Sequence, residues 1–380
     1  MKKKLIQFEN YLVNLKIQNL VILFFLIIFV KVGFWYHPAL WKLLTISINP
    51  FEESIFLNHQ AHYLYGNFLG GYMANLLGFT SKFTFFLFHL FFSFLFNFLF
   101  IFLIFKNLDR KAAIYSLIIF LVLPVSSTVF FWVGYDSITL SILVLSIIFK
   151  SNFFLVFIFG TLLGLQHFEL GLLTTLSLVV LNIYNSYYSK KSFLNLKYSI
   201  SIFTGTIVGK IFLKYYFLSI NLNLSSGRIS YTLEAIKHFL YNSYFNLYTI
   251  MWFSLSLGWL IILKYFFFKE KNKFFILILL SLILILFVVD DQTRVYANLS
   301  FLIIISQILL NNDFLKSIKN YEISLILILW LLMPYGWVWQ GVLRASMVTY
   351  DFAYFINYFF EIFNNKSINS SIIWPFKRFR

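Results

Sequence analysis

Carboxylates and imidazoles are few in this chain, and their positions are the feature that says most about its chemistry. The 380 residues include 14 Asp and Glu and six His. Half of the acids and most of the histidines fall where the apolar pattern predicts one face of a membrane, opposite to the basic turns. Several ionisable groups near membrane level indicate a functional site. The members are Glu52, Glu53, Asp136, Glu169, Glu234, Asp290, Asp291, His37, His59, His62, His167 and His238.

The remaining acidic residues that accompany basic turns are expected to be ordinary solvated charges. They are Glu9, Asp109, Glu270, Asp313 and Glu322.

The adjacent pair Glu52-Glu53 lies in the longest segment between apolar runs, residues 36–81. Two neighbouring carboxylates repel each other in a partly desolvated site, so one of them can hold or accept a proton near neutral pH. We therefore predict Glu53, or Glu52, as a catalytic base. The alternative is a solvated helix N-terminus, where acidic residues are favoured by the helix dipole.

The segment Gln166-His167-Phe168-Glu169 interrupts a long apolar stretch, residues 153–183. His167 and Glu169 are two positions apart and do not share one face of a helix. They are therefore expected to line a polar cavity and bind substrate hydroxyls, together with Asp136 in the Gly134-Tyr135-Asp136 turn. No His-x-x-x-His or Glu-x-x-His spacing supports a metal centre, so no metal ligand is assigned, and a divalent metal is left open.

The segment from Asp290 to Arg294 (Asp-Asp-Gln-Thr-Arg) directly follows an apolar run. The planar guanidinium of arginine suits phosphate or carboxylate. We expect Arg294, with Arg228, to bind a phosphate, and Asp290 and Asp291 to orient the guanidinium or a hydroxyl substrate. The alternative is an internal Asp291–Arg294 ion pair that caps the next helix.

The composition predicts that membrane helices position these residues. The chain is 61% hydrophobic and 12% charged, whereas soluble domains carry about 25% charged residues. Long apolar runs do not alternate as barrel strands do. The absence of cysteine excludes disulfides and Cys-type zinc sites. The runs are 19–35, 83–105, 112–132, 274–289 and 323–339.

The formal charge of +16 indicates orientation in a membrane, and no nucleic-acid partner is expected, because the basic residues gather in short turns. A break near His167 places eight basic loop residues inside and three outside. One unbroken helix is the alternative. We thus predict an all-α bundle of about 10–11 spans forming a single membrane domain (1–380), with an outer loop (36–81) and an interfacial C-terminal segment (351–380).

This layout resembles the GT-C superfamily of polytopic membrane glycosyltransferases. The matching features are the first loop with Glu52-Glu53, the turn at Asp136, and the Asp290–Arg294 segment. The family most often has an aspartate where this chain has glutamates. The resemblance implies a polyprenyl-phosphate-linked sugar donor, a glycan or lipid acceptor, and chemistry at the non-cytoplasmic face. The abundance of Phe, Ile, Leu, Lys and Asn also resembles bacterial O-antigen polymerases, which suggests the inner membrane of a bacterium.

The chemistry of such a donor favours the same class. A polyprenyl phosphate needs apolar surfaces between helices, a cation for its phosphate, and a base for the acceptor hydroxyl. A transporter or flippase would also have broken helices and buried polar residues, although we find no internal repeat. A non-catalytic membrane subunit is the third alternative.

Overall fold

The computed structural model of the protein describes residues 2–35, 40–51, 67–188, 192–219, 227–268, 273–333 and 335–346. The predicted interfacial segment 351–380 and the pair Glu52-Glu53 lie outside these ranges. Within them the chain is almost entirely helical, as the composition predicts, with one two-stranded sheet.

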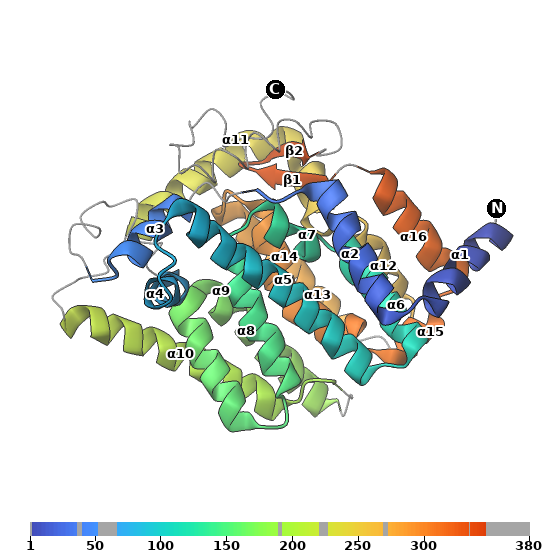
Figure 1. Ribbon diagram of the computed structural model, residues 1–380, viewed down its shortest axis with the longest axis horizontal. Helices are drawn as coiled ribbons and strands as arrows, with labels where there is room; N and C mark the ends of the chain where they lie inside the picture. The colour runs from blue at the N-terminus through green and yellow to red at the C-terminus, as the bar shows by residue number, and fades with distance from the viewer. Residues whose placement is uncertain are drawn as a thin grey trace.

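The elements follow one another in this order: α1 (Lys2–Asn14), α2 (Ile17–Val32), α3 (Leu40–Ile48), α4 (Phe68–Leu76), α5 (Lys82–Asn107), α6 (Arg110–Val122), α7 (Pro124–Phe131), α8 (Asp136–Ile148), α9 (Phe153–Tyr187), α10 (Leu196–Ser219), α11 (Gly227–Leu255), α12 (Gly258–Phe266), α13 (Lys273–Leu282), η3 (Ile283–Val288), α14 (Gln292–Ile304), η4 (Ile305–Leu309), α15 (Asn312–Ser317), α16 (Asn320–Leu332), β1 (Tyr335–Trp339) and β2 (Val342–Ser346). In Figure 1, α3, α4 and α10 reach one end of the molecule, and α1 and α16 lie at the other.

Three helices among the described residues, α5, α9 and α10, are long and apolar enough to cross a membrane. Three bent pairs pass the same test when each is taken as one span: α1 with α2, α6 with α7, and the end of α11 with α12. Length and composition thus support three to six crossings. The larger number predicted from the sequence stays a prediction.

Helix α9 is broken at the residue where the sequence predicts a break. His167 has φ −157° and ψ 81°, outside the helical region. Its Nδ1 accepts a hydrogen bond from the backbone N–H of Leu170 at 3.2 Å, so the imidazole caps the second half of the helix. The break leaves one half before His167 and one after it.

The first half of α9 packs on α10 through glycines at four-residue spacing on both helices. A Cβ added to Gly164 would lie 2.2 Å from the carbonyl oxygen of Thr206, and one added to Gly209 would lie 2.1 Å from that of Thr161. Gly160 and Gly205 meet in the same way. Small residues at this spacing let membrane helices approach closely.

The second half of α9 returns along α10 in the opposite direction. Gly171 lies against the side chain of Thr206, and the carbonyl oxygen of the same Thr206 lies against Gly164 of the first half. Further along, Asn182 Nδ2 donates to Ser199 Oγ at 2.6 Å. The contacts on α10 therefore move toward higher residue numbers along the first half and toward lower numbers along the second.

The apolar run 323–339, expected as one helix, forms two different elements. Helix α16 ends at Leu332, and Met333 is extended (φ −82°, ψ 141°). Tyr335–Trp339 is strand β1, which pairs antiparallel with β2. The residue after Met333 in the sequence is Pro334, and a residue before proline is biased away from helix. The predicted helix was too long for this reason.

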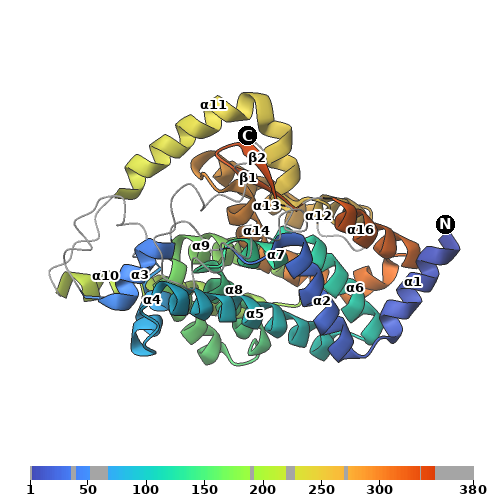
Figure 2. The ribbon, with the colours of Figure 1, turned by 45° about the horizontal axis from the view of Figure 1, so that its top comes forward.

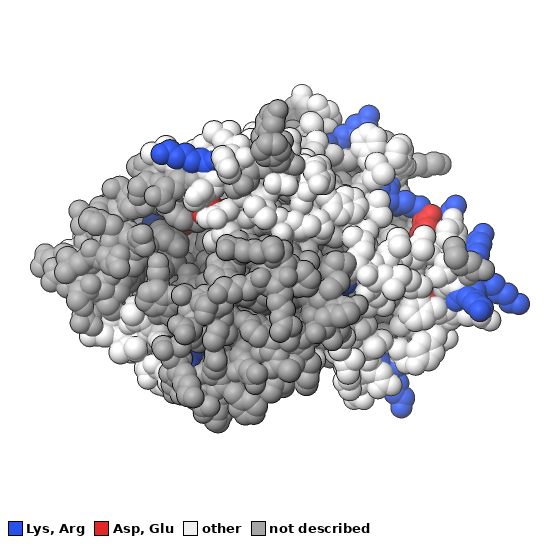
Figure 3. Space-filling model, turned by 90° about the horizontal axis from the view of Figure 1, so that it is seen from above, with Lys and Arg blue, Asp and Glu red and all other residues white. Residues whose placement is uncertain are grey.

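Glu9 is buried, so the prediction that it is a solvated charge is wrong. Its side chain accepts hydrogen bonds from Tyr115 Oη at 2.8 Å and from Asn320 Nδ2 at 3.1 Å. These bonds join α1 to α6 and α16. Lys2, Lys3 and Lys4 are exposed on α1, and Figure 3 shows basic side chains gathered at the end of the molecule where Figure 1 places the N-terminus.

Candidate functional site

Asp136 and Arg294, which are 158 positions apart in the sequence, form a buried ion pair. Asp136 is the first residue of α8, and Arg294 lies in the first turn of α14. Arg294 Nη1 donates to Asp136 Oδ2 at 2.5 Å, and Arg294 Nε donates to Asp291 Oδ2. All three side chains are at least nine-tenths buried. We call Asp136, Asp291 and Arg294 the ion cluster.

The ion pair between Asp291 and Arg294 that was an alternative from sequence is therefore present. Asp291 is at the N-cap position of α14, but its side chain makes no capping hydrogen bond. Its Oδ1 instead accepts from Trp337 Nε1 at 2.5 Å. Burial raises the pKa of the Asp291 carboxyl, against the lowering effects of Arg294 and Trp337. Two carboxylates and one guanidinium give the ionised cluster a formal charge of about −1.

The β1–β2 hairpin holds the Asp290–Arg294 segment in place. The backbone N–H of Val338 donates to Thr293 Oγ1 at 3.0 Å, and the N–H of Gln340 donates to the carbonyl oxygen of Asp290 at 2.6 Å. Gln340 and Gly341 form the turn with φ of 51° and 76°. Sequence reasoning missed the hairpin. Pro334 and Gly341, on either side of an aromatic strand, were the available signal.

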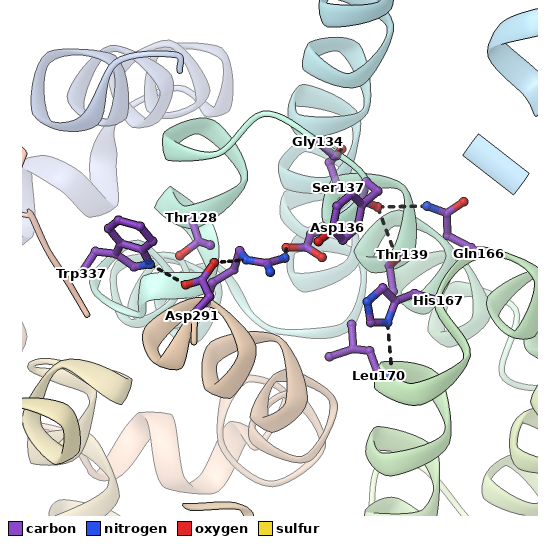
Figure 4. Close-up of polar contacts among 12 residues, drawn as sticks. Thr128, Gly134, Asp136, Ser137, Thr139, Gln166, His167, Leu170, Asp291 and Trp337 are labelled. Atoms are coloured by element: carbon purple, nitrogen blue, oxygen red, sulfur yellow. Dashed lines mark hydrogen bonds and ion pairs between the residues drawn. The ribbon is translucent and has the colours of Figure 1, made fainter. Parts of the chain in front are cut away.

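Tyr135 connects the ion cluster to the break in α9. The Arg294 guanidinium lies 5.5 Å from the Tyr135 ring centre. The His167 ring stacks on the same Tyr135 ring, with 5.8 Å between centroids and 13° between planes. Gln166 Nε2 donates to the Tyr135 carbonyl oxygen at 3.2 Å. Figure 4 shows Trp337, Asp291 and Asp136 in a row, with Gln166 and His167 beyond them.

Helix α4 also docks at the break. Gln166 Oε1 accepts a hydrogen bond at 2.7 Å from the backbone N–H of Gly70, in the first turn of α4. A Cβ on Gly70 would lie 2.8 Å from the side chain of Ile138 on α8. The close approach of α4, α8 and α9 thus depends on glycine at position 70.

A second polar group lies next to the Asp290–Asp291 segment. His238 of α11 has its Nδ1 3.3 Å from Asp290 Oδ1. Gln340 Nε2 is 3.4 Å from Asp290 Oδ2. The side chain of His238 is 45% exposed, whereas that of Asp290 is 6% exposed. Figure 2 shows α11 extending over the hairpin and α14.

The structure brings together Asp136, His167, Asp291 and Arg294 around Tyr135, with Asp290 on the adjoining side. Glu169 is half-buried, two residues beyond the break. Glu52 and Glu53 lie outside the described residues, as does the side chain of Arg228. Within the described ranges, no group of three or more His, Asp or Glu side chains is placed to hold a metal ion.

No protein-family model, curated protein or solved structure matches this chain.

Proposed function

We propose that the chain is a multi-pass membrane glycosyltransferase of the bacterial inner membrane. It transfers a sugar from a polyprenyl-phosphate donor to a glycan or lipid acceptor at the non-cytoplasmic face, in assembly of the cell envelope. The observation that carries this proposal is the buried ion cluster, because its residues come from distant parts of the sequence. Ionisable groups buried among apolar helices are costly and are found mainly where function requires them.

The ion cluster suits sugar binding and glycosyl transfer. Ionised carboxylates accept hydrogen bonds from sugar hydroxyls. Glycosyl transfer passes through a transition state in which the sugar ring gains positive, oxocarbenium-like character. A cluster with formal charge of about −1 favours that charge electrostatically. Arg294 fixes the positions of Asp136 and Asp291, and His167 adds a polar group at the same place.

The same geometry changes the part that we propose for Arg294. Its Nε and Nη1 are already engaged with carboxylates, and a phosphate beside two carboxylates is repelled. Arg294 therefore acts mainly by holding Asp136 and Asp291. We assign the donor phosphate to basic residues of α11, namely Arg228 and the exposed Lys237. Glu53 or Glu52 remains the base predicted from sequence, and a divalent metal is left open.

A genetic experiment tests this function. Cells that lack the chain should lose one surface glycan or glycolipid and accumulate its polyprenyl-phosphate donor, as measured by mass spectrometry. The parent chain should restore the product. Asp136→Asn, which keeps the size of the side chain, should be inserted in equal amount and fail to restore it. Unchanged glycans and donor levels in the deletion would contradict the proposal.

A transporter or flippase is the second candidate, and the reversal of α9 at His167 favours it. Discontinuous helices of this kind form substrate sites in transporters. An O-antigen polymerase would use a related donor at the same face. Detergent micelles do not separate two compartments, so a transporter has no measurable activity in them. Product formation by the purified protein in micelles would therefore identify an enzyme. The length of the product separates polymerase from single-sugar transferase.

A further inference from the structure

We infer that His238 accepts the proton of the acceptor hydroxyl, and that Asp290 is its positioning residue. This inference rests on the proposed glycosyl transfer and names a base that the sequence did not. It assigns to α11 and the hairpin the role that was predicted for Glu53 or Glu52 in the first loop.

The geometry of the pair supports this role. Nδ1 of the half-buried His238 lies 3.3 Å from the buried Asp290 carboxylate, and Gln340 Nε2 lies 3.4 Å from both Nδ1 and Asp290 Oδ2. In the tautomer in which Nδ1 carries the proton and donates it to Asp290, Nε2 is the basic nitrogen. A base oriented by a third group is the arrangement that activates hydroxyl nucleophiles in enzymes.

The location of His238 and Asp290 also supports the proposed role. Asp290 and Asp291 are adjacent in the chain, and Asp291 belongs to the ion cluster. The hairpin fixes both residues of this segment, because Trp337 contacts Asp291 and Gln340 contacts Asp290. A sugar held by the ion cluster and an acceptor hydroxyl held by His238 would thus both lie beside this one segment.

Glycosyl transfer forms one bond and breaks one. The acceptor oxygen forms a bond to the anomeric carbon while the bond between that carbon and the phosphate oxygen breaks. The electron pair of the broken bond leaves with the polyprenyl phosphate. The proton of the acceptor hydroxyl moves to His238 Nε2 and is later released to water. Asp290 stabilises the imidazolium that forms.

The charged groups around His238 are few in the described part of the chain. Helix α11 packs there against η3, α14, β1 and β2. No Asp, Glu, Lys or Arg occurs in η3 or β1. The segment before α14 contributes Asp290 and Asp291, and Lys237 is the exposed neighbour on α11 itself. Arg344 of β2 and Glu234 of α11 belong to the same elements, but their side chains lie outside the described residues.

The test is sugar transfer by the full-length protein in micelles, measured against pH with a polyprenyl-phosphate sugar donor. His238→Gln should lose about 10²–10⁴-fold in rate. A histidine base is inactive when protonated, so the parent should lose rate as the pH falls, and H238Q should lack this dependence. Added imidazole should restore part of the rate of His238→Ala, because the side chain is 45% exposed. Tyr241→Phe is the matched control, because Tyr241 is 81% exposed on the same helix, and it should keep the parental rate.

Two comparisons separate the alternatives. Asp290→Asn should lower the rate, and Asp290→Glu, which keeps the carboxylate, should lower it less. Glu53→Gln and Glu52→Gln should each lose less than H238Q. A rate for H238Q within about threefold of the parent, which is far below the effect of a lost base, would overturn the inference. A larger loss in Glu53→Gln would return the role to the first loop.

A failure of the proposed function has a different signature. If the parent itself transfers no sugar, the glycosyltransferase proposal fails, and the pair is tested by its reactivity instead. Diethylpyrocarbonate modifies exposed neutral imidazoles, and H238Q identifies the signal from His238. Asp290→Asn should change the rate of that modification, because it alters the group beside Nδ1. Equal rates in the parent and D290N would show that the two side chains do not interact.

Discussion

Replacing Arg294 by methionine would remove the guanidinium that lies between two buried carboxylates. Asp136 and Asp291 both bond to this group, and each is 4% exposed. Two like charges about 4 Å apart interact by about 4 kcal/mol at an effective dielectric constant of about 20. Breaking a buried ion pair by removing one partner typically costs about 3–5 kcal/mol. We expect R294M to lose stability in this range.

The formal charge of the ion cluster predicts an order of stability among the variants. With all groups ionised, the formal charge is −2 + 1 = −1 in the parent. R294M leaves two carboxylates and no guanidinium, whereas Asp136→Asn leaves one of each. D136N should therefore be the milder change, although it removes the same Asp136–Arg294 bond. The double variant R294M/D136N should recover part of the loss seen in R294M, because one carboxylate then remains.

The assay is the apparent unfolding temperature in detergent, followed by tryptophan fluorescence. Since membrane proteins often unfold irreversibly, the variants are ranked at one scan rate. Lys264→Met is the control, because it breaks the partly exposed Lys264–Glu322 pair, with Nζ 2.8 Å from Oε2. Pairs of that kind contribute about 0–1 kcal/mol. An unfolding temperature of R294M no lower than that of K264M would contradict this prediction. So would a lower unfolding temperature for D136N than for R294M.

Three further predictions concern the packing and orientation of the helices. Gly209→Ala should separate α9 from α10, since the new Cβ meets the Thr161 carbonyl oxygen at 2.1 Å; it should lower the unfolding temperature well below that of the exposed control Val208→Ala, and equal midpoints would contradict this packing. Glu9→Ala should remove the acceptor of Asn320 Nδ2 and leave Tyr115 Oη with Asn320 Oδ1, 3.2 Å away, and a buried donor without its acceptor costs about 1–3 kcal/mol. The variant should therefore increase proteolysis of α1, and unchanged proteolysis would count against this packing. A cysteine at position 237 of this cysteine-free chain should react with an impermeant maleimide from outside intact cells, whereas one at 190 should not, and the reverse pattern would invert the predicted orientation.

The sequence predicted those parts of the fold that depend on local composition. Apolar runs identified the helical class, and the distribution of basic residues favoured the break that His167 makes in α9. The four-residue spacing of Gly160 with Gly164, and of Gly205 with Gly209, is also readable. That these two pairs face each other is not, because helix pairing depends on the path of the whole chain.

Contacts between distant segments account for what the sequence did not predict. An apolar segment such as Tyr335–Trp339 has the same composition as a helix, and its pairing with β2 decides that it is a strand. Glu9 resembles a surface charge until Tyr115 and Asn320 are known to lie beside it. The pair of His238 and Asp290 also depends on such a contact. Glu52 and Glu53 lie outside the described residues, so their catalytic role stays a prediction.

The most direct test of the account is sugar transfer by the purified full-length protein in detergent micelles, with a polyprenyl-phosphate sugar and an acceptor lipid or glycan. We expect the parent to form the glycosylated product and to release polyprenyl phosphate, and D136N to be recovered in micelles in equal amount but to form no product. Donor that remains intact with the parent, while the same protein in vesicles moves it across the bilayer, would contradict the account and identify a transporter.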